Sequence, residues 1–234
     1  MTSPASGAVD LPDYAPIPRS ALGPALNDQR YYVGRVERNL YWVTDGVYNS
    51  AFLTTSDGVV VFDAPPSIGP NHTPDNIYIH FPDHDTLMFI DVVNAGWVPI
   101  YNLNLSEDVI GYMGAPAIAL SYPWTHFICG HLGRLATRED VAVHQQYIAD
   151  IEASSREALA SVNPVPYYVG AGENFWLGVK GHLDAVTERA AAPVIAKYTG
   201  VLAAADIPVF TETTTFQIMQ SLRLDKGPPG PVHP

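Results

Sequence analysis

The chain is poor in cysteine and in basic residues. It has one cysteine, Cys129, so an internal disulfide framework is excluded and the composition fits a reducing compartment. Only 12 Lys and Arg stand against 24 Asp and Glu, which gives a net charge of −12. Because nucleic acids and anionic membranes are recognised through basic patches, we expect neither as a partner. The charge itself needs no explanation beyond solubility.

Long apolar runs are also missing. No stretch of about 20 apolar residues could span a bilayer, and no basic segment followed by an apolar one marks a signal peptide. We therefore expect a soluble, cytoplasmic protein. With 234 residues, of which 47% are hydrophobic and 15% charged, the composition is typical of a globular protein.

Composition divides the chain into three segments. Residues 1–28 are rich in Pro, Ala and Ser without periodicity, which predicts an irregular lead-in. Residues 29–226 are expected to form a single domain whose last third, from about residue 137, is helical. The tail at 227–234 consists mainly of Gly and Pro and is predicted to be disordered.

Strand patterns come first along the chain and helix patterns follow. Alternating segments with Asp-Gly turn signals predict a β-meander and further strands at 31–36, 40–44, 50–54, 58–62, 76–80, 86–91 and 125–129. Helical spacing and capping signals predict helices at 106–112, 137–162, 174–189, 193–205 and 211–222. Thr137 and Asp140 resemble a capping box. The order predicts a layered α/β or α+β fold.

Three residues that could bind a metal follow predicted strands. Asp91 ends an apolar strand, where a carboxylate needs a metal, an Arg or backbone amides to offset its desolvation. His131 follows Gly130 beyond another strand, and His72 lies in a proline-rich loop. His72 is also the first histidine of the chain, so all imidazole ligands must come from position 72 onward. His72, Asp91 and His131 would give zinc three protein ligands and leave a position for water.

The remaining histidines and the cysteine are weaker candidates. His80 and His84 flank a turn and could be exposed, whereas His126 fits a packed position at the edge of the core. Cys129 could bind zinc through sulfur or belong to the core, because it shares a strand face with position 131. We expect the two helical histidines to face solvent: His144 and His182.

The segments 41–53 and 57–65, followed in order by His72, Asp91 and His131, resemble the metallo-β-lactamase-fold hydrolase superfamily. Residues 41–53 are similar to the opening strands of that family, and residues 57–65 to the next strand, which ends in a structural aspartate, here Asp63. The resemblance extends from about residue 31 to about 151. It implies an αββα sandwich in which His72 binds the first zinc, Asp91 bridges two metals and His131 binds the second.

One departure from that family is clear. The signature His-x-His-x-Asp-His loop, normally placed between the strand at Asp63 and His72, is missing together with its helix-and-strand segment. The resemblance therefore implies a sandwich with a truncated first half, an incomplete metal site and at most one zinc ion. Loss of a layer exposes apolar surface, which a homodimer could cover.

Two functions from different classes remain open at this point. The first is a metal-dependent hydrolase in which metal-activated water attacks a small-molecule ester, thioester, lactam or phosphoester. The second is a non-catalytic relative: a pseudoenzyme, a binding module or a deletion isoform. Fold alone does not choose the substrate.

Overall fold

The computed structural model describes residue 12 and residues 14–62 and 78–224. A four-stranded antiparallel meander comes first, and its strand order is β1-β2-β3-β4. Its strands are β1 (Tyr32–Glu37), β2 (Leu40–Thr44), β3 (Asn49–Thr55) and β4 (Gly58–Phe62). These strands lie within one residue of the predicted ones, because alternating side chains and Asp-Gly turns specify a meander locally.

A second, three-stranded sheet follows, in the order β5-β6-β7. It contains β5 (Ile79–Phe81), β6 (Thr86–Phe89) and β7 (His126–Cys129). β6 pairs antiparallel with β5 and parallel with β7. The carboxyl ends of β6 and β7 therefore lie at the same edge of this sheet, a position where loops bring functional side chains together.

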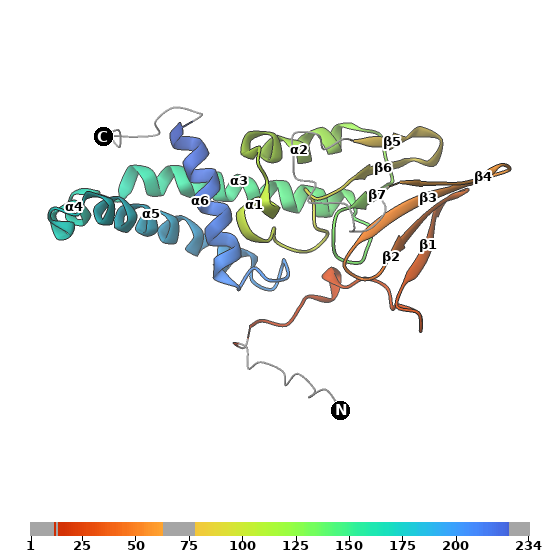
Figure 1. Cartoon of the computed structure of the whole chain (residues 1–234), viewed down its shortest axis with the longest axis horizontal. Helices are drawn as coiled ribbons and strands as arrows, with labels where there is room; N and C mark the ends of the chain where they lie inside the picture. The colour runs from red at the N-terminus through yellow and green to blue at the C-terminus, as the bar shows by residue number, and fades with distance from the viewer. Residues whose placement is uncertain (1–11, 13, 63–77, 225–234) are drawn as a thin grey trace, which may run out of the picture.

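The two sheets face each other, and the helices cover the far side of the second sheet. Leu40, Trp42 and Ala51 of the first sheet share one buried cluster with Met88 and Ile128 of the second. Alternate residues of β6 and β7 point the other way, into a larger cluster with the helices. The layers are thus sheet, sheet and helices (Figure 1).

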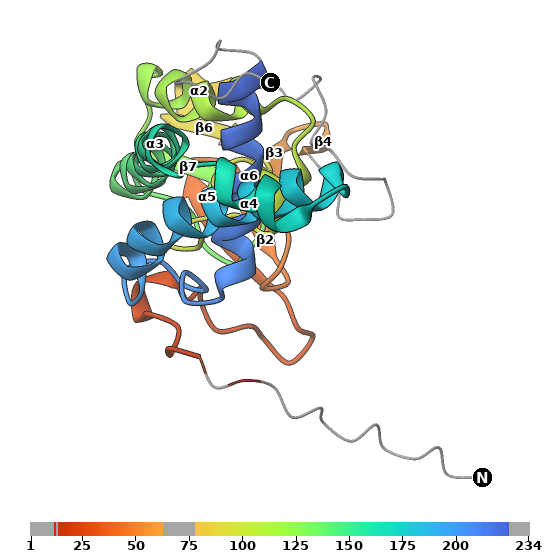
Figure 2. The same ribbon diagram turned by 90° about the vertical axis from the view of Figure 1, so that its left-hand side faces the viewer.

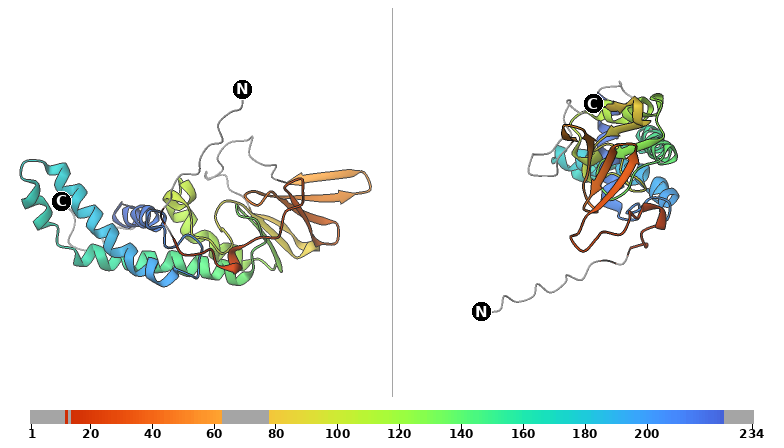
Figure 3. Two further views of the ribbon diagram at one scale, coloured as in Figure 1. Left: turned by 90° about the horizontal axis from the view of Figure 1, so that it is seen from below. Right: turned by 90° about the vertical axis from the view of Figure 1, so that its right-hand side faces the viewer.

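The helical part is larger than the sequence indicated. Its elements are α1 (Tyr101–Leu105), α2 (Val109–Ser121), α3 (Arg138–Ser161), α4 (Val165–Ala171), α5 (Phe175–Tyr198) and α6 (Pro208–Leu224). Helices α3 and α5 form a long hairpin with α4 at its tip, and α6 crosses them (Figures 1 and 2). The hairpin tip and the β3–β4 hairpin lie at opposite ends of the molecule (Figure 3).

Two helix predictions need correction, and one helix was not predicted. Pro193 does not start a separate helix but lies inside α5, where packing of Ala190, Val194 and Tyr198 in the core offsets the lost hydrogen bond. The segment 106–112 contains only the start of α2, whose N-cap is Asp108. No sequence signal had indicated α4. The predicted helix at 211–222 is confirmed by α6.

The two helical histidines are buried, so the expectation that they face solvent is wrong. Both His144 and His182 are 2% exposed. Neither ring nitrogen of His144 has a hydrogen-bond partner among the described residues, and burial lowers its pKa to about 4. Helical spacing alone does not reveal this, because α3 and α5 are covered on more than one face by each other and by α6.

The lead-in before β1 is irregular apart from one short 3-10 helix, Arg19–Ala21, as far as residues 14–28 describe it. It packs on the domain nonetheless: Ala21 is buried and its carbonyl oxygen accepts a hydrogen bond of 3.1 Å from the indole of Trp97. The predicted disordered tail at 227–234 lies outside the described residues. None of the described helices combines the length and the apolarity that crossing a membrane requires.

Candidate functional site

Two of the three candidate ligands meet where β6 and β7 end. Nε2 of His131 lies 3.0 Å from Oδ1 of Asp91. The Asp91 side chain is 9% exposed and the His131 side chain 31%, so the carboxylate is buried and the imidazole reaches solvent. The parallel pairing of β6 and β7 explains the meeting, since it carries both following loops to one edge. The third candidate, His72, lies outside the described residues.

The backbone around Asp91 is held in an unusual conformation. Asp91 has a φ of 71°, in the left-handed region. Gly130 passes so close that a Cβ there would collide with the backbone nitrogen of Asp91. Only glycine therefore lets the end of β7 approach this turn, and the approach brings His131 next to the carboxylate.

Asn104 fixes the loop that carries Asp91. Its Nδ2 donates hydrogen bonds of 3.1 Å to the carbonyl oxygen of Asp91 and 3.2 Å to the hydroxyl of Tyr112. Its Oδ1 accepts from Nδ2 of Asn94 at 3.1 Å and from the backbone N–H of Ile100 at 2.8 Å. This buried side chain thus satisfies four neighbouring groups at once.

The turn that presents Asn104 is left-handed. α1 has φ values of 53°, 57° and 55° at Asn102, Leu103 and Asn104, and Leu105 continues at 64°. A left-handed turn costs roughly 1–2 kcal/mol per non-glycine residue, so the buried hydrogen bonds of Asn104 must offset a substantial cost. Strain of this kind is typical of loops that position a site.

Tyr48, in the loop between β2 and β3, and Asn49, the first residue of β3, hold the His131 loop from the other sheet. The Tyr48 ring contacts the imidazole edge-on, with 4.9 Å between ring centroids. Nδ2 of Asn49 donates to the carbonyl oxygens of Cys129 at 3.1 Å and Gly130 at 3.0 Å. The buried Oδ1 of Asn49 has no hydrogen-bond partner among the described residues. Both sheets therefore build the site, although only the second supplies its two ionisable groups.

An ion pair anchors the far end of the His131 loop to α3. Arg134 makes two hydrogen bonds, of 2.7 and 2.8 Å, to the carboxylate of Asp140. Asp140 also completes the predicted capping box with Thr137, which is confirmed. Burial raises the pKa of Asp140, but the hydrogen bonds from Arg134 and Thr137 outweigh it and leave the pKa below its usual value.

The other candidate ligands lie elsewhere. Nε2 of His80 contacts the carbonyl oxygen of Pro123 at 3.1 Å, and Nε2 of His84 lies 2.8 Å from Oδ1 of Asn39. His126 is 3.9 Å from Glu37. Cys129 is fully buried, and burial raises the pKa of its thiol to about 11. The core interpretation of Cys129 is therefore the right one.

The pair fits part of a zinc site. Two tetrahedral ligands at zinc bond lengths of about 2.0–2.2 Å lie roughly 3.3–3.5 Å apart. Nε2 of His131 and Oδ1 of Asp91 lie 3.0 Å apart, which is a hydrogen-bond distance, so the two atoms need to separate by a few tenths of an ångström to share the ion. A catalytic zinc, however, takes three protein ligands. Among the described residues no group of three His, Cys, Asp or Glu side chains could hold a metal ion. The described donors thus amount to a two-residue half-site.

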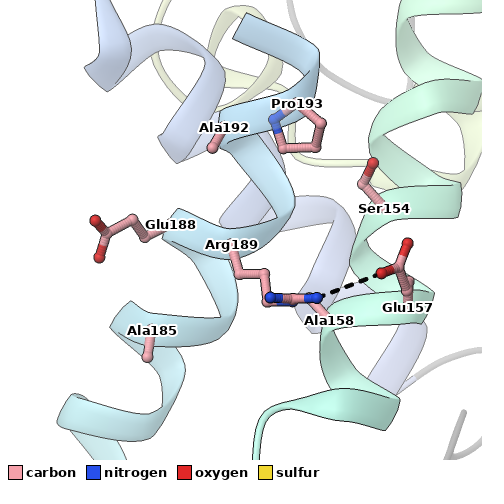
Figure 4. A pocket seen from close by; sticks show the side chains of 8 residues that line it. All are labelled: Ser154, Glu157, Ala158, Ala185, Glu188, Arg189, Ala192 and Pro193. Carbon is pink, nitrogen blue, oxygen red and sulfur yellow. Dashed lines mark ion pairs between the residues drawn. The ribbon is translucent and has the colours of Figure 1, made fainter. Parts of the chain in front are cut away.

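A groove on the helical hairpin is unrelated to this pair. It has a volume of about 590 Å³ and lies between α3 and α5, where Arg189 pairs with Glu157 at 3.6 Å (Figure 4). Ser154, on its wall, is 14 residues along α3 from Asp140, or about 21 Å at 1.5 Å per residue. The groove therefore lies far from the loop that carries His131.

The sequence interpretation did not find Tyr48, Asn49, Asn104 or Gly130 as part of the site. The asparagines carried a usable signal, because Asn is rarely buried without a structural task. No protein-family model, no curated protein and no solved structure matches the chain. The class that the structure defines is thus a mixed α/β protein with two sheets and a helical hairpin.

Proposed function

We propose that the chain is a relative of the metallo-β-lactamase-fold hydrolases that lacks a helix-and-strand segment of its first half. In this proposal the Asp91–His131 pair is the remaining part of the metal site. One observation carries it: the two residues that the resemblance assigns to the second metal lie 3.0 Å apart at the ends of neighbouring parallel strands.

The layering supports the same proposal. Two facing sheets with helices on the outer side of the second correspond to three layers of an αββα sandwich. No described helix packs extensively on the first sheet, which is where the fourth layer would lie. The segment missing from the sequence falls directly after β4, at the edge of that sheet.

The residues have distinct tasks in this proposal. Asp91 and His131 would hold one zinc ion, and His72 would complete the ligand set. Zinc, when bound, supplies a water of lowered pKa for attack on an ester, thioester, lactam or phosphoester. Asn104 and Gly130 position the carboxylate, and Tyr48 orients the imidazole. The exposed side of His131 leaves a small-molecule substrate room to approach.

A second candidate is a non-catalytic relative, and the number of donors favours it. Two ligands hold zinc more weakly than the three of a catalytic site, and the half-site of the described residues reaches only two. Such a protein would bind metal loosely and act as a binding module or pseudoenzyme.

Metal content separates these candidates. Elemental analysis of untagged protein purified without chelator is expected to give about one zinc per chain, and His131→Ala and Asp91→Asn should each lose it. His80→Ala is the matched control, since His80 contacts Pro123 instead of the pair, and should keep the metal. His72→Ala tests the third ligand.

Zinc that is unchanged in His131→Ala would reject the proposed site. Near-zero zinc in the unmodified protein would leave the non-catalytic candidate. If zinc is present, a screen of ester, thioester, lactam and phosphoester substrates decides whether the protein hydrolyses any of them, with His131→Ala as the inactive reference.

A further inference from the structure

The last strand of the first sheet is unusually exposed for an apolar strand. β4 lies at the end of the sheet order, and no described strand pairs with its free side. Val59, Val60 and Val61 are 59%, 49% and 59% exposed. Edge strands normally carry charges, a proline or a bulge that discourages pairing with other chains. β4, with the sequence GVVVF and an uninterrupted register to β3, has none of these.

The opposite edge of the same sheet shows the usual protection. β1 carries Arg35 and Glu37, and its pairing with β2 is interrupted by a register shift between these two residues. Both features hinder the addition of another strand. Within the same sheet, one edge is thus protected against pairing with another strand and the edge formed by β4 is not.

The hydrogen-bonding groups of β4 can be assigned from its register. Thr55 and Gly58 are partners on either side of a two-residue turn, so they form a hydrogen-bonded pair. The N–H of Thr54 instead donates to the carbonyl oxygen of Asn39 at 3.0 Å, on the side of β2. Since the pattern alternates, Val59 and Val61 direct their N–H and C=O groups away from β3.

We propose that β4 is a homodimer interface, in which it pairs antiparallel with β4 of a second copy about a twofold axis at Val60. Val59 and Val61 lie symmetrically about Val60, so the axis places Val59 of each copy opposite Val61 of the other. Four backbone hydrogen bonds then form, and no charged side chain of either strand is brought opposite another. Such self-complementarity is what an isologous interface requires.

The chain itself offers poorer occupants for this edge. Within residues 63–77 and within residues 225–234 no proline-free run exceeds three residues, and proline cannot donate to a ladder. Residues 5–11 are free of proline and are the one alternative tested below. Pairing with a second copy also brings the exposed Val59 and Val61 side chains of the two molecules into contact on the outer face of the joined sheet. The strand is short, so we expect the dimer to be weak and dependent on concentration.

Cross-linking tests the register directly. In this arrangement the two Val60 residues form a non-hydrogen-bonded pair with about 4.5 Å between Cα atoms, within the range that a disulfide spans. Val60→Cys should therefore give a disulfide-linked dimer under mild oxidation. Val33→Cys, on β1 at the other edge, is the matched control and should cross-link at least about tenfold more slowly. Cys129 is buried and will not compete.

Sedimentation velocity tests the association without a cross-link. The unmodified protein should shift from monomer to dimer as concentration rises toward about 100 µM. Val59→Lys with Val61→Lys places like charges opposite each other and should abolish the shift, whereas Val33→Lys should not. Far-UV circular dichroism checks that each variant folds.

Three results would overturn the proposal. They are a monomer at every concentration, a dimer that survives the double lysine variant, and equal cross-linking of the Val60→Cys and Val33→Cys proteins. If removal of residues 1–11 makes a monomeric protein dimerise, those residues occupy the edge instead of a second copy.

Discussion

β4 and β6 are equally apolar in sequence but opposite in environment. β4 reads GVVVF and exposes most of its side chains, whereas β6 reads TLMF and is buried at every position. β6 lies between β5 and β7, with one face toward the first sheet and the other toward the helices. β4 has a neighbour on one side only. The burial of an apolar strand is thus decided by its neighbours and not by its composition.

The comparison extends to the candidate site. The second sheet, covered on both faces, supplies Asp91 and His131 and holds them through a buried hydrogen-bond network. The first sheet contributes support through Tyr48 and Asn49, and in the proposed ancestry it has lost the segment that would carry further ligands. The two ionisable residues of the candidate site thus both follow strands of the sheet whose two faces are covered.

The largest expected effect comes from truncating a side chain in the buried strand. Leu87→Ala in β6 removes a fully buried side chain and should lower the free energy of unfolding by about 2–5 kcal/mol. Val60→Ala in β4 should lower it by less than about 1 kcal/mol. Urea denaturation at low protein concentration measures both. Equal losses would show that β4 is buried in solution.

A smaller loss of unfolding free energy, about 3 kcal/mol at most, is expected when the pH is lowered, because of the buried histidine of α3. The pKa of His144 is lowered to about 4 by burial, from 6.5, so the unfolded chain takes up its proton first as pH falls. This group's contribution to stability is complete above pH 6.5 and is lost between pH 6.5 and 4.

The pH dependence is measured by urea denaturation at intervals from pH 7.5 to 4. Carboxylates of the protein also titrate in part of this range, so His144→Leu serves as the reference. Its free energy of unfolding should decline less steeply between pH 6.5 and 5. Parallel curves for the two proteins would mean that His144 is not held neutral in the folded state.

The smallest of the three effects concerns the network behind Asp91. Asn104→Ala leaves several buried groups without their hydrogen bonds and should cost about 2 kcal/mol, measured by thermal or urea unfolding. Asn102→Ala, in the same left-handed turn, is the matched control and should cost under about 1 kcal/mol. If zinc is bound, Asn104→Ala should also weaken its retention, because hydrogen bonds to the residues that bind a metal orient those residues. Equal costs in the two variants would contradict the role given to Asn104.

Much of the fold could be predicted locally. Turn signals and alternation placed β1 to β4 within a residue, and the capping box at Thr137 marked the start of α3 correctly. The errors share one cause, which is tertiary packing. Pro193 stays helical because its neighbours are buried, and His144 is enclosed because another helix covers its face of α3.

The candidate site divides in the same way. Asp91 and His131 were recognisable as polar residues beyond apolar strands, whereas Asn104 acts through a left-handed turn that no spacing reveals. Whether His72 joins them is a prediction that the described residues do not test.

The sequence by itself determined the order of strands and helices, the absence of a disulfide framework, the acidic charge and two residues of the candidate site. These follow from local rules of alternation, capping and composition. Only the tertiary structure decided that Asp91 and His131 meet, because the parallel pairing of β6 and β7 joins residues 40 positions apart in the chain. It also decided that one edge of the first sheet stays open, since exposure depends on which strands lie beside it.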